Sequence, residues 1–182
     1  MSKPDDTKLI ERCIEGDRQA FETLLVQYEK PVFNAAYRML NNRDDASDVT
    51  QTVFLKVYEN FDSFDPSRRF FSWIYRITLN ESINWLGKQN RLEPLQHETA
   101  DEGKSPEQEV SSAELSAEIQ AALMTIKTDY RAVIILKHFL GCSYVEISEV
   151  LEIPEKTVKS RLYSARQILK DALAKTGKQD GY

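Results

Sequence analysis

The last third of the sequence carries side chains that could read the bases of duplex DNA. Two stretches with helical apolar spacing, residues 143–151 and 155–174, are separated only by Glu152-Ile153-Pro154, which is typical of a helix-turn-helix. Thr157 would lie in the first turn of the second helix. Its outer face would carry hydrogen-bonding side chains: Lys156, Lys159, Ser160, Tyr163 and Ser164.

Such residues fit the major groove, where donors and acceptors distinguish all four base pairs. Arg161 and Arg166 are better suited to phosphates, which position a protein without reading sequence. The same pattern would also describe an ordinary helical hairpin with a solvated basic face. The spacing alone therefore leaves both interpretations open.

A run of aromatic and basic residues, 61–91, could bind single-stranded nucleic acid. Cations meet phosphates and rings stack on unpaired bases, and the polar loop before Phe71 could receive a base turned out of the duplex. The alternative is structural. Trp73, Ile74 and Ile77 stand at helical spacing and would then belong to a core.

A third set of residues, on a helix containing residues 45–57, could contact another protein. Asp48, Gln51, Thr52 and Leu55 share one face of this helix, and Val49, Val53 and Val57 share another. The polar face with its single leucine is either solvated surface or a docking face for a partner helix.

Helices must position all three sets, because apolar residues recur at i, i+3, i+4 and i+7 along most of the chain. Pro31 stands where the first turn of a helix tolerates proline. Asn41-Asn42-Arg43 is a break, after which Asp44 or Asp45 could cap the next helix. No stretch alternates at period two, so no sheet is expected.

We therefore expect an all-α fold with two small helical domains, residues 1–91 and 113–182, joined by an acidic flexible linker, residues 92–112. The linker interpretation follows from a polar composition that buries too little apolar surface to order itself. The second domain would contain four helices, including the helix-turn-helix.

Charge is distributed in the same way, although the chain carries a formal net charge of -5. Residues 66–91 hold five basic side chains against Glu81 alone, and residues 153–178 hold seven against two acidic ones. Between them, residues 93–118 hold eight acidic side chains against Lys104 alone. Two basic segments thus flank an acidic one, and local patches matter more than net charge.

Several function classes are disfavoured. No apolar run approaches the roughly 20 residues that span a bilayer, and MSKPDDTK lacks an apolar signal core, so we expect a cytoplasmic protein. Cys13 and Cys142 are expected to be buried thiols, without a disulfide framework or metal site. No nucleophile-base pair or phosphate loop is visible, and His138 is expected near the core rather than in catalysis. We expect no enzyme activity, cofactor, metal or small-molecule substrate.

Together, three stretches resemble the extracytoplasmic-function sigma factors of bacterial RNA polymerase, over roughly residues 8–175. The family pattern D-A-x-D-[LV]-x-Q-x-x-F stands at residues 45–54, and F-x-x-W-[LI]-Y-R-I-x-x-N stands at residues 70–80. The helix-turn-helix pattern S-Y-x-E-I-x-x-x-[LM]-x-[IC]-P-x-x-T-V-[KR]-S-R-[LI] stands at residues 143–162. Their order across an acidic linker makes the resemblance highly specific.

The resemblance implies roles for each set of residues. The first domain (sigma region 2) would dock on the coiled-coil of the largest subunit of core polymerase through Asp48, Gln51, Thr52 and Leu55. It would also open the -10 promoter element with the loop 62–69, which captures a flipped base, and with the helix that follows. The -10 residues would be Asp62, Ser63, Arg68, Arg69, Arg76, Asn80 and Asn84.

The second domain (sigma region 4) would read the -35 element and meet the polymerase flap. Its DNA-binding residues would be Lys156, Thr157, Lys159, Ser160, Arg161, Tyr163, Ser164 and Arg166. The acidic linker would follow the polymerase channel towards the RNA exit. The resemblance also implies an anti-sigma factor, which could hold the protein inactive at the membrane.

The chain departs from the family pattern at several positions. Ser47 and Thr52 stand where relatives often carry glutamate, Ser164 where they often carry a basic residue, and Glu152 where glycine is common in the turn. A left-handed conformation at Glu152 would cost about 1 kcal/mol. An alternative function, a helix-turn-helix regulator that acts without docking on polymerase, would explain residues 143–174 but not the other two sets.

Overall fold

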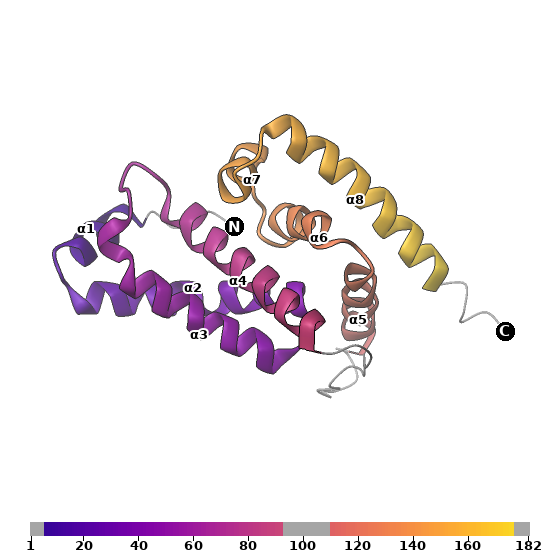
Figure 1. Cartoon of the computed structure of the whole chain (residues 1–182), viewed down its shortest axis with the longest axis horizontal. Coiled ribbons are helices and arrows are strands. Elements are labelled where there is room, and N and C mark those ends of the chain that lie inside the picture. Colours follow the sequence, from indigo (N-terminus) through magenta and orange to yellow (C-terminus); the bar gives the residue numbers. More distant parts are fainter. Residues whose placement is uncertain (1–5, 93–109, 177–182) are drawn as a thin grey trace.

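The computed structural model describes residues 6–92 and 110–176, which form helices with no β-strand among them (Figure 1). The helices are α1 (Thr7–Ile14), α2 (Arg18–Leu40), α3 (Arg43–Glu59), α4 (Phe70–Leu92), α5 (Val110–Met124), α6 (Thr128–Ile134), α7 (Tyr144–Leu151) and α8 (Glu155–Thr176). A 3-10 turn, η1 (Phe61–Ser63), precedes α4, and a π-helical turn, η2 (Ile135–Phe139), extends α6. The expected all-α fold is confirmed.

Helices α1–α4 form the first module. Asp17 caps α2 by accepting hydrogen bonds from the backbone N–H groups of Gln19 (2.9 Å) and Ala20 (3.2 Å). Helix α2 then runs without interruption through Pro31, so this proline does not begin a new helix as its position had indicated. The missing N–H costs one backbone hydrogen bond, which the burial of Val32 and the apolar residues after it offsets.

The turn between α2 and α3 uses two asparagines. Asn41 ends α2 in the left-handed conformation (φ 56°), which asparagine tolerates better than most residues. The Asn42 side chain caps α3, because its Oδ1 accepts hydrogen bonds from the backbone of Asp44 (2.9 Å) and Asp45 (3.1 Å). The expectation that Asp44 or Asp45 is the cap is therefore wrong. Both lie in the first turn, where negative charge suits the helix dipole.

Four aromatic rings pin the loop before α4 to the core. The Trp73 ring lies 5.0 Å from that of Phe64 and 5.8 Å from that of Phe70, centroid to centroid, and Phe61 completes the cluster at 6.2 Å. Edge and tilted contacts of this kind add to the stabilisation from burial. Trp73 is thus a packing residue, as its spacing with Ile74 and Ile77 indicated.

Helices α5–α8 form the second module, the expected four-helix domain. Gly141, a residue type that commonly ends helices, follows η2 with φ +66°, the left-handed conformation typical of that position. Ser143 and Glu146 cap α7 reciprocally, side chain to backbone. Glu152 ends α7 in the left-handed conformation (φ 52°, ψ 41°). The usual turn is therefore retained at a position that lacks glycine, at the cost noted above.

The histidine and cysteine expectations have mixed outcomes. Cys142 is buried and Cys13 is half-buried, and neither forms a disulfide. His138 is exposed rather than near the core, because the π-helical turn rotates residues 137–139 relative to a regular helix and brings Phe139 to the surface as well. His97 lies outside the described residues.

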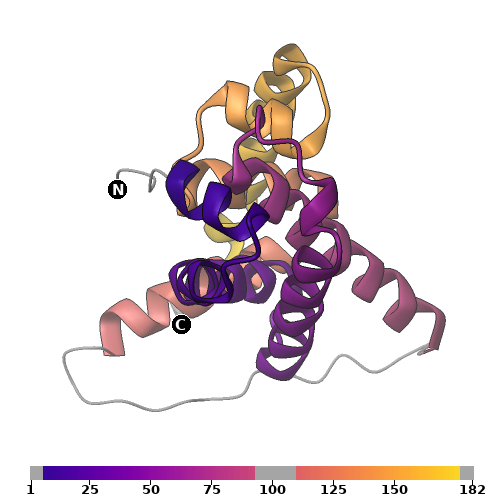
Figure 2. The same ribbon diagram turned by 90° about the vertical axis from the view of Figure 1, so that its left-hand side faces the viewer.

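The two modules pack against each other (Figure 1, Figure 2), with α2 beside α5 and α6 and with α4 beside α7. Arg131 is buried at this junction and donates to the carbonyl of Met39 in α2 and to those of Met124 and Ile126, both at 3.1 Å. Burial lowers the pKa of its guanidinium. Gln120 adds hydrogen bonds to the end of α2. The buried apolar residues of both modules consequently form one contiguous cluster.

Most of the predicted linker, residues 93–109, lies outside the described residues. Helix α4 ends at Leu92, the first residue of the predicted linker, and α5 begins at Val110, so that it includes the last three residues of that linker. The domain boundaries stay a prediction.

Candidate nucleic-acid and protein interfaces

One face of α8 is free to meet DNA. Val158, Leu162 and Ala165 are buried and hold the helix against its module. The opposite face is exposed, with Tyr163 keeping 69% of its surface accessible. Of the exposed predicted residues, the four near the start of the helix, which we call the recognition row of α8, are Lys156, Lys159, Ser160 and Tyr163. The structure thus exposes five of the eight residues predicted for this surface, these four and Arg166.

The other predicted residues of α8 lie nearer to the module. Thr157 and Ser164 are half-buried. Arg161 pairs with Asp129 of α6 at 3.3 Å, and the exposed Arg166 donates from Nε to His138 Nε2 at 3.3 Å. Two of the predicted phosphate contacts therefore already have partners within the module.

The surroundings of His138 disfavour its charged form. Partial burial, followed by the positive charges of Arg166 and Lys137, lowers the pKa of the imidazole. A neutral ring can accept the Arg166 hydrogen bond, whereas a protonated ring would repel it.

The predicted -10 residues lie in the loop before α4 and on α4 itself. Asp62, Ser63, Arg68 and Arg69 are exposed in the loop before α4. Asp65 shapes this loop by accepting from the Ser67 backbone (2.9 Å), and hydrogen bonds from Ser67 hold the pKa of its carboxyl below the usual range.

On α4, Arg76, Asn80 and Asn84 follow at i, i+4 and i+8 and share a helix face. Both asparagines are exposed, and Arg76 is half-buried.

The first half of this α4 face is covered by α7. Arg69 pairs with Glu146 at 2.7 Å, the Ser72 hydroxyl donates to Glu149 at 2.9 Å, and Arg76 pairs with Glu152. The sequence reasoning did not foresee these contacts. The i, i+3, i+6 spacing of the three glutamates could have indicated an acidic row, but not which element it faces.

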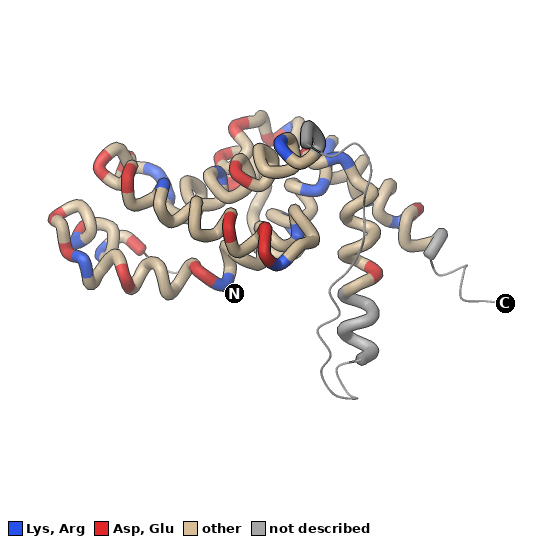
Figure 3. The backbone as a smooth tube through the Cα atoms, turned by 60° about the horizontal axis from the view of Figure 1, so that its bottom comes forward, with Lys and Arg blue, Asp and Glu red and all other residues tan. Residues whose placement is uncertain are grey.

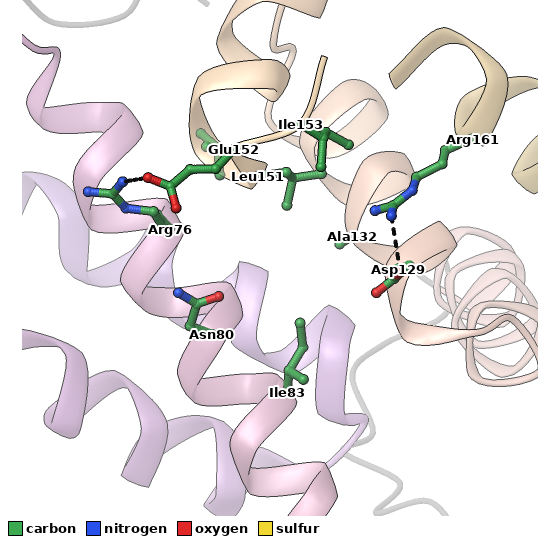
Figure 4. Close-up of a pocket in the computed structure, with 10 residues that line it drawn as sticks. Arg76, Asn80, Ile83, Asp129, Ala132, Leu151, Glu152, Ile153 and Arg161 are labelled. Carbon is green, nitrogen blue, oxygen red and sulfur yellow. Dashed lines mark hydrogen bonds and ion pairs between the residues drawn. The ribbon is translucent and has the colours of Figure 1, made fainter. Parts of the chain in front are cut away.

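A hollow of about 270 Å³ lies between the modules beside these contacts (Figure 4). Arg76 reaches across to Glu152 at one side, and Arg161 pairs with Asp129 at the other. Asn80 lines the hollow from α4. Basic and acidic positions are interspersed along both modules (Figure 3). Each arginine of the hollow pairs with an acidic residue.

The third predicted surface, on α3, is open. Asp48, Gln51 and Leu55 are exposed, with 61% of Leu55 accessible. Thr52 is half-buried, and its hydroxyl donates to the Asp48 carbonyl at 2.9 Å. Val49, Val53 and Val57 are buried beneath this face, as predicted.

One residue of the α3 face was missed by the sequence reasoning. Tyr58 lies one turn beyond Leu55 and keeps 68% of its surface exposed. The i, i+3 spacing from Leu55 could have identified it. We call Asp48, Gln51, Leu55 and Tyr58 the docking row of α3.

Two other kinds of site are absent from the described part of the chain. No group of three His, Cys, Asp or Glu side chains there could hold a metal ion. No helix among the described residues is both long and apolar enough to cross a bilayer.

Comparisons with known proteins match both modules. The family model "Sigma-70 region 2" matches residues 24–92, and "Sigma-70, region 4" matches residues 116–169. The chain is 36% identical to "ECF RNA polymerase sigma factor SigW" of Bacillus subtilis, over 91% of this chain and 95% of that protein. It is 32% identical to "ECF RNA polymerase sigma-E factor" of Escherichia coli K12, over 90% and 92%.

A solved structure, CnrH in complex with the cytosolic domain of CnrY, is similar throughout. Its TM-score is 0.74 at 27% sequence identity, covering 93% of this chain and 97% of that one. The helical architecture of both modules is therefore shared with a solved relative.

Proposed function

The chain belongs to the extracytoplasmic-function sigma factors, and from this premise we propose how its surfaces direct RNA polymerase to promoters. It binds core polymerase, recognises a -10 and a -35 element, and initiates transcription. The observation that carries the residue assignment is the recognition row of α8. Four side chains capable of base and phosphate contacts stand exposed on a helix whose opposite face is locked into the core.

In our proposal α8 enters the major groove of the -35 element. Lys156 and Lys159 supply cations, and Ser160 and Tyr163 supply hydroxyls that donate or accept hydrogen bonds. The Lys159 ammonium lies 5.7 Å from the Tyr144 ring centroid, a contact that holds the lysine near the start of α8. Arg161 and Arg166 would reach phosphates only after releasing Asp129 and His138.

We assign the -10 element to the first module. The loop 62–69 is polar and anchored by the aromatic cluster at its base, so it can offer a rigid pocket for an unpaired base. Asn80 and Asn84 are exposed on α4, and Arg69 and Arg76 would neutralise the phosphates of the melted strand.

The docking row of α3 is assigned to core polymerase. An exposed leucine and tyrosine flanked by polar residues match the composition of a protein-protein contact, with apolar anchors and a polar rim. The absence of glutamate at positions 47 and 52 makes this face less acidic than the family pattern.

Control by an anti-sigma factor is part of the proposal. It is supported by the solved relative CnrH, whose structure is of a complex with the cytosolic domain of CnrY. A partner of this kind would meet the protein in the cytoplasm, where polymerase works. The protein itself acts as a non-enzymatic initiation factor, and the chemistry of RNA synthesis belongs to the polymerase.

Run-off transcription with sigma-free core polymerase and a genomic promoter library tests the proposal. We expect the purified chain to confer promoter-dependent transcripts, whereas core polymerase alone gives none. A helix-turn-helix regulator that acts without docking would instead bind duplex DNA strongly by itself and would leave core polymerase inactive. Absence of transcripts with an intact, inhibitor-free chain would refute the sigma assignment.

A further inference from the structure

We propose that the free protein masks its own -10 DNA face with the acidic row of α7, which occupies the arginines that would bind the phosphates of the melted strand. The acidic row consists of Glu146, Glu149 and Glu152, and the masked residues are Arg69, Ser72 and Arg76. The contact itself stands on geometry alone. Its effect on DNA binding rests on the function proposed above.

The two sets of side chains match along both helices. Glu146, Glu149 and Glu152 recur every three residues, and Arg69, Ser72 and Arg76 recur at three and four, so consecutive members meet as pairs. One member of each ion pair is largely buried, since 10% of the Glu146 side chain and 24% of the Arg76 side chain remain exposed, whereas Arg69 and Glu152 keep 66% and 64%. Each pair joins residues that are 76 or 77 positions apart in the chain.

The acidic row offers the same chemistry as a nucleic-acid strand. A carboxylate and a phosphate both present charged oxygens that accept hydrogen bonds from a guanidinium. Each arginine meets its glutamate through Nη1, and the paired carboxylate offsets the positive charge that would attract a phosphate. Binding of α7 therefore competes with binding of single-stranded DNA, more strongly at Arg76, whose side chain is 24% exposed, than at Arg69, whose side chain is 66% exposed.

Glu152 provides an independent sign that this contact matters. Its left-handed backbone conformation (φ 52°) would be adopted without strain by glycine. Glutamate accepts the strain, and its side chain supplies the carboxylate that reaches Arg76 (Figure 4). The residue that makes the turn less favourable is thus the same residue that closes the mask.

The closed arrangement cannot persist on a promoter. The -10 and -35 elements are separated by about 25 base pairs, or about 85 Å at 3.4 Å per base pair. Modules in direct contact cannot reach both elements, so they must separate. The pairs of the mask are partly exposed and individually weak, so polymerase and DNA can displace them. Contacts of Arg131 and Gln120 with α2 hold the free chain closed until then.

Reversible cross-linking tests whether the contact forms and whether it excludes DNA. The variant Ser72→Cys/Glu149→Cys, in a background without Cys13 and Cys142, is treated with a short bis-maleimide whose spacer is cleaved by a reductant. We expect intramolecular cross-linking, loss of binding to a short single-stranded DNA of randomised sequence, and recovery on cleavage. Failure to cross-link, or unchanged DNA binding when cross-linked, would overturn the mask. If the cleaved protein also fails to bind DNA, the mask is unsupported and the proposed -10 function fails with it.

Unmasking by mutation provides the complementary test. Glu149→Gln/Glu152→Gln leaves the capping glutamate Glu146 intact and should tighten binding of the same DNA about fivefold at low salt, since more of the population is competent to bind. Added salt should shrink this ratio towards one, because it screens the pairs in the unmodified chain. The matched control is Glu155→Gln/Asp171→Asn, which makes the same charge change at exposed positions of α8. If both variants increase the affinity for DNA equally, the effect comes from net charge alone, which would contradict the mask.

Discussion

The recognition row of α8 and the DNA face of α4 are both basic, yet they differ in what covers them. Lys156, Lys159 and Tyr163 are exposed in the free chain, whereas Arg69 and Arg76 are already paired with glutamates of α7. The difference indicates an order of events. The -35 surface is ready before polymerase arrives, whereas the part of the -10 surface that α7 contacts becomes fully available only when the modules separate.

The docking row of α3 belongs with the open surfaces. It lies on the first module but away from the contacts that α4 makes with α7, so polymerase can engage it while the chain is closed. Docking on polymerase therefore precedes unmasking in this scheme. Four experiments would break or sharpen the comparison.

The largest effect is expected at the docking row. Gln51→Arg/Leu55→Asp should weaken the affinity for core polymerase by about 100-fold, because it introduces charge at the apolar centre of an interface. Both side chains are exposed, so the thermal midpoint should stay near that of the unmodified chain. Co-purification with core polymerase measures the effect, and Glu22→Lys on α2 serves as a surface control. Unchanged co-purification would refute this docking face.

The second experiment compares the two basic surfaces directly in the free chain. Lys159→Ala should weaken binding to duplex promoter DNA by about five- to tenfold, since its side chain is uncovered. Arg76→Ala should change binding of single-stranded DNA by the free chain less than about twofold, because Glu152 already occupies that arginine.

Fluorescence anisotropy measures both affinities. In the unmasked Glu149→Gln/Glu152→Gln background, Arg76→Ala should weaken the binding of single-stranded DNA more than it does in the unmodified chain. An equal loss of DNA affinity from Arg76→Ala in both backgrounds would show that the mask does not compete with DNA. Lys170→Ala, on α8 beyond the recognition row, is the control for charge.

The third experiment separates backbone strain from side-chain pairing at Glu152. Glu152→Gly removes a left-handed cost of about 1 kcal/mol and loses one partly exposed ion pair worth about 0–1 kcal/mol. We expect a net gain in unfolding free energy below about 1 kcal/mol. Glu152→Gln keeps the strain and loses the charge, so it should be slightly less stable than the unmodified chain. Urea unfolding measures both variants, and a glycine variant less stable than the glutamine variant would contradict the assigned strain.

The smallest effect concerns pH and His138. The pKa of its imidazole is lowered in the folded protein, so the unfolded chain binds the proton more readily. The associated stability is present above the unfolded pKa of about 6.5 and is lost as pH falls through the folded pKa. Thermal unfolding across this range should show a small decrease in the unfolding temperature as pH falls. The decrease should disappear in His138→Gln and persist in His97→Gln. If the decrease in stability persists in His138→Gln, it arises from other titrating groups.

Local features of this chain could be predicted from sequence with good fidelity. The apolar spacing of Val49, Val53 and Val57 correctly identified the buried face of α3, and Gly141 correctly marked the end of a helix. Each of these depends on neighbours within a few residues, which the helical period already specifies. The same locality explains why Trp73 could be placed in a core.

Errors arose where several residues could perform the same local task. Asn42, Asp44 and Asp45 are all competent caps, and only the position of the break decides among them. Pro31 could either begin a helix or lie inside one. It lies inside α2, because burial of the apolar residues that follow offsets the lost hydrogen bond. His138 was displaced by a π-helical turn, which has no strong signature in the sequence.

The sequence by itself determined the helices, the three sets of functional side chains and the family, because helical periodicity and motif spacing are properties of contiguous residues. Only the tertiary structure decided that the glutamates of α7 face the arginines of α4, about 77 positions away. A helical pattern states which face of an element is polar, but it carries no information about which distant element that face meets. That pairing depends on how two modules with their own cores pack together, and here it determines which DNA surface is open.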